Sequence, residues 1–141
     1  GRHISLHIEQ IEDLVCTDSK WLGFIIEQLI SNAVKYSKDG GSVRIYTLHG
    51  SDGIKKNSKE DSLQLVIEDT GIGISEEDIP RIMERGFTGY NGRLDKKSSG
   101  IGLYLCRKAA DRLGFVITFD ASYKNGTRVV IDMTQRYTKH E

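Results

Sequence analysis

Residues 63–74 read Leu-Gln-Leu-Val-Ile-Glu-Asp-Thr-Gly-Ile-Gly-Ile, and this stretch decides the fold. Its first half alternates in the way that is typical of a strand with one buried face. The strand leads through Asp69 into a turn with glycines at 71 and 73. Because glycine has no Cβ, a flat ligand could approach the backbone closely there. We therefore expect a strand that ends in a turn suited to binding.

Strand and helix patterns flank this stretch on both sides. Further alternating strands are expected at 3–9, 13–16, 43–47, 115–121 and 127–133. Apolar residues at helical spacing predict helices after Asp18, at 80–85 and at 100–113. Asn125-Gly126 between the last two strands is a strong hairpin signal. This order predicts an α+β fold, a two-layer α/β sandwich whose mixed, mostly antiparallel sheet carries helices on one face.

Length, composition and charge exclude several classes of protein. The 141 residues, 38% hydrophobic and 28% charged, are typical of one globular domain, which we place at 1–141. Twenty Lys and Arg balance twenty Asp and Glu, so no net charge attracts nucleic acid. No apolar run approaches the ~20 residues that cross a bilayer. Gly1 stands in place of a Met, so we expect a fragment of a longer chain that can itself span a membrane.

The two cysteines do not form a recognisable metal or disulfide pattern. Cys16 and Cys106 are 90 positions apart, without a C-x-x-C motif or a neighbouring paired histidine. We expect reduced, buried thiols in a cytosolic domain.

The first long helix carries a polar stripe beside its apolar face. Gln28, Asn32, Lys35 and Tyr36 share this stripe because residues three or four apart lie on one side of a helix. Amide oxygens are hard neutral ligands that suit Mg²⁺, and an ammonium group suits phosphate oxygens. The alternative interpretation is an ordinary solvated polar face.

Two glycine-containing turns are the other candidate binding features. Asp69-Thr-Gly also occurs in aspartic proteases, but their chemistry needs two carboxylates that share a proton, and a plain turn is a further alternative. Ser98-Ser-Gly-Ile-Gly-Leu103 places a glycine pair at a predicted helix N-terminus, which favours anion binding. The sequence contains neither the Rossmann fingerprint nor a Walker loop.

Taken together and in this order, four motifs resemble those of one family. Glu27–Tyr36 is similar to the N box, Asp69–Gly73 to the G1 box, Arg85–Thr88 to the F box and Ser99–Leu103 to the G2 box of the catalytic and ATP-binding domain of bacterial sensor histidine kinases. The resemblance covers Ile4 to about Met133 and implies the Bergerat fold of the GHKL (HATPase_c) proteins, shared with DNA gyrase B. Residues 86–93 and 102–107 resemble the intramembrane-sensing subgroup that responds to bacitracin and other antimicrobial peptides.

The resemblance implies ATP and Mg²⁺ as cofactors and gives individual residues roles. Asn32, Gln28 and Lys35 would be the catalytic set, with Asn32 and Gln28 on Mg²⁺, although most members have Asn where Gln28 stands. Lys35 and Tyr36 would contact phosphate or ribose, and Asp69 would accept a hydrogen bond from the adenine amino group. The other implied nucleotide contacts are Gly71, Gly73, Ile74, Phe87, Gly100, Ile101, Gly102, Leu103 and Thr127.

Phosphate transfer to a protein is favoured over hydrolysis. Hydrolysing relatives have a Glu at the position of Gln28, and an amide cannot take a proton from water. Glu27 lies about 100° further round the helix and should not replace that base. The resemblance also implies an acceptor histidine, but none of the histidines at 3, 7, 49 and 140 has the family's sequence context.

The acceptor is therefore expected upstream, on the protein's own dimerisation and phosphotransfer domain. A response regulator would receive the phosphoryl group next. The parent would be a plasma-membrane homodimer with this domain in the cytoplasm, associated in some systems with an ABC transporter. The alternatives are an anti-sigma-factor serine kinase of the same fold and a non-enzymatic, nucleotide-gated binding module.

Residues 86–99 are predicted to form a lid over the triphosphate. The segment has glycines at 86, 89 and 92, followed by Gly100, and no apolar periodicity. Arg93, Lys96 and Lys97 could reach the phosphates. A passive linker is the alternative.

Overall fold

The computed structural model describes residues 3–9, 19–49, 63–87 and 101–133. Within them, one sheet is formed by β1 (Ser5–Ile8), β2 (Ser42–His49), β3 (Leu63–Asp69), β4 (Val116–Phe119) and β5 (Thr127–Asp132). The helices are α1 (Ser19–Lys35), α3 (Gly102–Leu113) and the short 3-10 helix η2 (Ile79–Arg81). The predicted strand at 13–16 and the segment from residue 88 to 100 lie outside the described residues.

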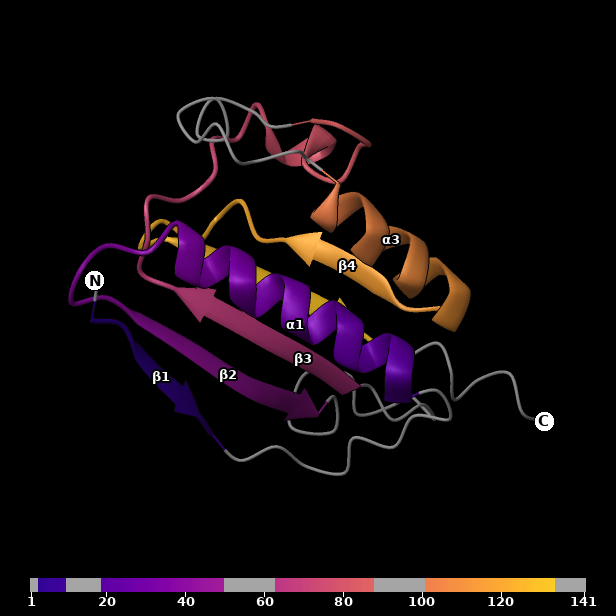
Figure 1. Ribbon diagram of the computed structural model, residues 1–141, viewed down its shortest axis with the longest axis horizontal. Coiled ribbons are helices and arrows are strands. Elements are labelled where there is room, and N and C mark those ends of the chain that lie inside the picture. Colours follow the sequence, from indigo (N-terminus) through magenta and orange to yellow (C-terminus); the bar gives the residue numbers. More distant parts are fainter. Residues whose placement is uncertain (1–2, 10–18, 50–62, 88–100, 134–141) are drawn as a thin grey trace.

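The sheet is mixed, with the strand order β1-β2-β3-β5-β4. Only β1 and β2 run parallel among the described strands, and the other three neighbouring pairs are antiparallel. Both α1 and α3 lie on one face of the sheet (Figure 1). The predicted two-layer α+β sandwich with a mostly antiparallel sheet is therefore confirmed.

The core fills the space between this face and the two helices. β3 is the central strand, and its Leu65 and Ile67 are 1% exposed. They pack in one cluster with Ile25 of α1, Cys106 of α3 and Ile131 of β5, each 0% exposed. Burying an aliphatic side chain of this size contributes about 1.5–3 kcal/mol. The helices are held on the sheet by this cluster, which places α1 beside the end of β3.

The expectation of a half-buried first strand is wrong for two of its residues. Leu6 and Ile8 are 52% and 64% exposed. Their register opposite Val43 and Ile45 puts them on the core side of the sheet, as alternation predicts. However, β1 is the edge strand, and the described helices do not cover these two side chains.

Several element boundaries differ from the sequence-based expectation. α3 begins at Gly102 rather than at residue 100, and Leu105, one of the apolar residues whose spacing predicts this helix, is 42% exposed rather than buried. The buried residues of α3 are Cys106, Ala109, Ala110 and Leu113. Leu105 precedes Cys106 by one residue and therefore points about 100° away from it around the helix. The helix predicted at 80–85 is only η2. The hairpin predicted at Asn125-Gly126 forms, although residues 120–126 all connect its shortened strands.

The thiol prediction is confirmed for Cys106, which is free and fully buried. Burial raises the pKa of this thiol to about 12. Cys16 lies outside the described residues. Within the described ranges, no helix has the length and apolar character needed to cross a membrane.

Candidate functional site

The buried carboxylate of Asp69 lies at the end of β3 and is 5% exposed. Its Oδ1 accepts hydrogen bonds from the backbone N–H groups of Gly71 at 2.8 Å and Thr127 at 3.2 Å. Burial raises the pKa of Asp69, and these two hydrogen bonds act in the opposite direction. Within the described part of the chain, no hydrogen bond reaches Oδ2. One oxygen therefore anchors the turn, and the other is available to a ligand.

Three backbone segments meet around this carboxylate because glycine allows them to approach. A Cβ on Gly126 would lie 2.0 Å from the carbonyl oxygen of Asp69. A Cβ on Gly71 would lie 2.5 Å from the carbonyl oxygen of Tyr36, which also accepts a hydrogen bond from the Ile72 N–H at 3.3 Å. The end of α1, the turn after β3 and the β4–β5 hairpin are thus held together at one end of the sheet.

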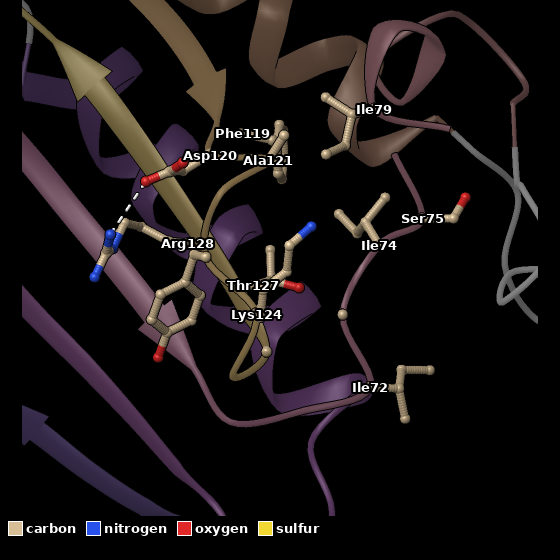
Figure 2. A pocket seen from close by; sticks show the side chains of 13 residues that line it. Ile72, Ile74, Ser75, Ile79, Phe119, Asp120, Ala121, Lys124, Thr127 and Arg128 are labelled. Carbon is tan, nitrogen blue, oxygen red and sulfur yellow. Dashed lines mark hydrogen bonds and ion pairs between the residues drawn. The ribbon is translucent and has the colours of Figure 1, made fainter. Parts of the chain in front are cut away.

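A cavity of about 300 Å³ opens beside this junction, between residues 72–79 and the β4–β5 hairpin. In Figure 2, Ile74 and Ile79 face the hairpin across the cavity. Its walls are formed by Ile72, Gly73, Ile74, Ser75, Ile79, Phe119, Asp120, Ala121, Tyr123, Lys124, Gly126, Thr127 and Arg128. Lys124 Nζ pairs with Glu76 Oε2 at 2.7 Å and so links the hairpin to the segment opposite. The cavity combines an apolar wall with polar groups, as small-molecule sites do.

Gly73, Ile74 and Thr127 are the predicted site residues that line this cavity. Thr127 also connects the cavity to Asp69 through its backbone N–H. Sequence reasoning missed Ile79, Phe119, Lys124 and Arg128. The only available signal was that Arg128 directly follows Thr127 in a predicted strand.

The polar stripe of α1 lies next to the beginning of α3. Gln28 and Asn32 are partly buried, one helical turn apart. The Oε1 atom of Gln28 is 2.7 Å from the position that a Cβ on Gly102 would take. Two stretches far apart in the sequence, the predicted amide stripe and the glycine pair, are therefore in contact. Glu27 is exposed, which agrees with its expected position on another side of the helix.

The last residues of the stripe turn toward the junction. α1 ends at Lys35, so Tyr36 lies just beyond the helix, where its N–H donates to the Asn32 carbonyl oxygen at 3.3 Å. Lys35 Nζ lies 5.5 Å from the centre of the Tyr36 ring. This geometry keeps a cation and an aromatic ring together beside the turn after β3.

The remaining predicted contacts are not all brought to the cavity. Phe87 lies under the Arg81 guanidinium, whose Cζ is 4.5 Å from the centre of the Phe87 ring. Ile101 accepts a hydrogen bond from the Leu105 N–H at 2.9 Å, and Leu103 packs against the core. Gly100 and the predicted lid cations lie outside the described residues.

Gln28 and Asn32 are the described side chains of the predicted metal site. The described residues contain no group of three or more His, Cys, Asp or Glu placed to bind a metal. Gln28 and Asn32 instead offer neutral amide oxygens on neighbouring turns of α1. Mg²⁺ usually keeps several waters and binds through one or two protein ligands and substrate phosphates. The residues present therefore fit Mg²⁺ bound to a nucleoside phosphate.

Residues 17–136 match the model of the histidine kinase-, DNA gyrase B- and HSP90-like ATPase family. Sensor protein kinase GraS of Staphylococcus aureus (strain JH1) is 39% identical over 120 residues, which are 85% of this chain and 32% of GraS. Sensor protein BceS of Bacillus subtilis (strain 168) is 41% identical over 113 residues, 80% of this chain and 31% of BceS. This chain thus spans about a third of the length of these curated relatives.

Solved structures of histidine kinases have the same fold. The mycobacterial sensor histidine kinase MprB superposes with a TM-score of 0.76 at 24% identity, covering 93% of this chain and 83% of MprB. The catalytic domain of histidine kinase ThkA gives a TM-score of 0.68 at 21% identity, covering 93% and 78%. At these identities the likeness concerns the fold alone.

Proposed function

Because the chain belongs to the histidine kinase-, DNA gyrase B- and HSP90-like ATPase family, we propose that it is the ATP-binding catalytic domain of a sensor histidine kinase. The family bears out the resemblance drawn from the motifs and makes ATP the nucleotide. The GraS and BceS relatives are named as sensor proteins, so the anti-sigma-factor alternative is not favoured. The observation that carries the proposal is the buried Asp69 carboxylate, with one oxygen left for a ligand beside the cavity.

Asp69 would recognise adenine. Its Oδ2 can accept a hydrogen bond from the exocyclic amino group, whereas the carbonyl oxygen of guanine would be repelled. Gly71, Gly73 and Thr127 hold the carboxylate and the adjoining backbone, and Ile74 offers an apolar surface to a base. This part of the site determines which base binds.

The α1 stripe and the beginning of α3 would hold the phosphates. Gln28 and Asn32 would hold Mg²⁺, which supplies positive charge that offsets the charge of the triphosphate. Lys35 and Tyr36 would contact phosphate or ribose, and Gly102 with Ile101 and Leu103 would present the N-terminal end of α3 to the phosphates. Phe87 and Gly100 complete the proposed nucleotide contacts. Asn32, Gln28 and Lys35 would position the γ-phosphate for transfer.

The α1 stripe favours transfer to a protein side chain over hydrolysis. Gln28 carries an amide where a general base would stand, and it cannot deprotonate water. Glu27 is exposed and does not replace it. Water in the site would therefore attack slowly, and a histidine presented by another domain would be the faster acceptor.

The rest of the proposed system lies outside this chain. We place the acceptor histidine on a dimerisation and phosphotransfer domain, and a response regulator after it in the relay. The parent would be a membrane-bound homodimer that holds this domain in the cytoplasm. GraS and BceS are named as sensor proteins, which supports a sensor as the parent. From the motif resemblance we propose that the parent senses antimicrobial peptides and works with an ABC transporter.

Incubation with γ-labelled ATP, Mg²⁺ and a separately produced dimerisation domain tests the proposal. The expected product is label on that domain, lost in acid and retained in alkali, because phosphohistidine is acid-labile. A dimerisation domain without its histidine is the control. Acid-stable label would instead indicate a serine kinase, and binding of ATP without transfer would indicate a nucleotide-gated binding module.

A further inference from the structure

An ion-pair network centred on the buried Glu68 lies on the face of the sheet opposite the helices. Glu68 is 4% exposed, and its Oε2 is 2.8 Å from Arg128 Nε on β5. Its Oε1 is 3.2 Å from Arg44 Nη1 on β2, and the Tyr46 hydroxyl donates to Oε2. Arg128 also contacts Asp120 Oδ2 at 3.1 Å through Nη1. Glu68 is thus fixed between the two strands that flank β3.

Glu68 and Arg128 are each next in sequence to a residue of the proposed adenine site, Glu68 to Asp69 on β3 and Arg128 to Thr127 on β5. Glu68 is opposite Arg128 in the β3–β5 register, and Asp69 is opposite Thr127. The Thr127 N–H donates to Asp69 Oδ1, so the position of β5 determines where that oxygen is held. The tolerance is small, because Gly126 has no room for a Cβ against the Asp69 carbonyl oxygen. A small shift of β5 would therefore reorient the carboxylate.

We propose that Glu68 and Arg128 are positioning residues for adenine recognition: their ion pair holds β5 so that Asp69 presents Oδ2 to the 6-amino group of the base. The inference rests on the proposed function, because it concerns the same nucleotide site. Neither carboxylate oxygen of Glu68 touches the cavity, so its effect on a ligand passes through Arg128 and Thr127.

Arg44 offers a matched comparison. It also pairs with Glu68, but from β2, and its side chain is 45% exposed and bound to Glu9 at 2.8 Å. Loss of Arg44 removes an ion pair of Glu68 without releasing the strand that carries Thr127. A role in stability alone would make Arg44 and Arg128 behave alike, whereas a positioning role would separate them.

The experiment compares ADP with purine riboside 5′-diphosphate, which lacks the 6-amino group, by titration calorimetry. The measured quantity is the ratio of the two dissociation constants. In the unaltered protein, loss of a hydrogen bond to a charged acceptor should weaken binding about tenfold or more. In Glu68→Gln and Arg128→Lys this ratio should fall by at least about threefold, toward one, as expected for coupled neighbours. Arg44→Gln should keep the original ratio.

The outcomes separate this inference from the function beneath it. A ratio near one in the unaltered protein would remove Asp69 from base recognition and overturn both. A large original ratio that persists in Glu68→Gln and Arg128→Lys would overturn the positioning role alone, as would an equal fall in Arg44→Gln. If Glu68→Gln does not fold, Arg128→Lys decides, because it keeps the charge and loses the planar guanidinium.

Discussion

Replacing Asp69 by asparagine should nearly abolish adenine nucleotide binding without unfolding the protein. The asparagine oxygen can still accept the N–H groups of Gly71 and Thr127, which hold Oδ1 at 2.8 and 3.2 Å. Its amide nitrogen then takes the place of Oδ2 and presents a donor to the adenine amino group, which is also a donor. Two donors would face each other where the native site pairs a donor with a charged acceptor.

The size of the effect follows from that exchange. A hydrogen bond to a charged group contributes about 1.5–3 kcal/mol, and a mispaired buried group adds to its loss. We expect ADP affinity to fall by about 2–3 kcal/mol, roughly 30- to 150-fold, in titration calorimetry. Asp111→Asn, the same change at an exposed position on α3, should bind ADP normally. ADP affinity within about threefold of the original would refute the assignment of Asp69.

The pH dependence of stability shows whether Asp69→Asn still folds. Burial raises the pKa of Asp69 above its ordinary value of 3.8, so the folded protein holds this proton more tightly than the unfolded chain. The free energy of unfolding therefore declines as pH rises from 3.8 through the folded pKa. Asp69→Asn has no proton to lose and avoids this decline. Its melting temperature near pH 7 should equal or exceed that of the unaltered protein, and a lower one would contradict the account of burial.

Three further variants test other contacts. Gly126→Ala should lower the free energy of unfolding in urea by at least about 3 kcal/mol, because its Cβ would lie 2.0 Å from the Asp69 carbonyl oxygen; a loss below about 1 kcal/mol would contradict this packing. Gly102→Ala should displace the Gln28 amide, 2.7 Å from the new Cβ, and weaken Mg²⁺-ATP more than metal-free ADP; equal weakening would count against Gln28 as a metal ligand. Burial and a hydrogen bond raise the pKa of Tyr46 to about 12, so this phenol ionises at lower pH in the unfolded chain than in the folded protein. The free energy of unfolding should therefore fall between pH 10 and 12. Tyr46→Phe should reduce this fall and remove the tyrosine ionisation step seen near pH 12 in absorbance at 295 nm.

The sequence specified the architecture well because hydrophobic periodicity determines which face of each element is buried. Alternation in residues 63–68 located the central strand, and Asn125-Gly126 located the hairpin. Leu105 shows the limit of this reasoning. It is apolar and inside a predicted helix, but the direction of a helical side chain depends on where α3 packs against α1.

The candidate site was only partly predictable for a related reason. Asp69 was proposed because its strand end and the glycines at 71 and 73 are visible along the chain, whereas Thr127 was proposed only through the family resemblance. The pairing of Glu68 with Arg128 was not visible, since it depends on β5 lying next to β3. Contacts between neighbouring strands can be predicted only when the strand order and register are known.

Two adjacent carboxylates on β3 are equally buried, and their hydrogen-bond partners distinguish a structural group from a candidate binding group. Glu68 and Asp69 are 4% and 5% exposed and point to opposite faces of the sheet. Both oxygens of Glu68 are paired, with Arg44, Arg128 and Tyr46 as donors. Among the residues that the structure describes, Asp69 has donors on one oxygen only, and its pKa is raised because its charge is buried with too little compensation. A ligand that donates to Oδ2 supplies the missing compensation, so Asp69 gains from binding in a way that Glu68 cannot.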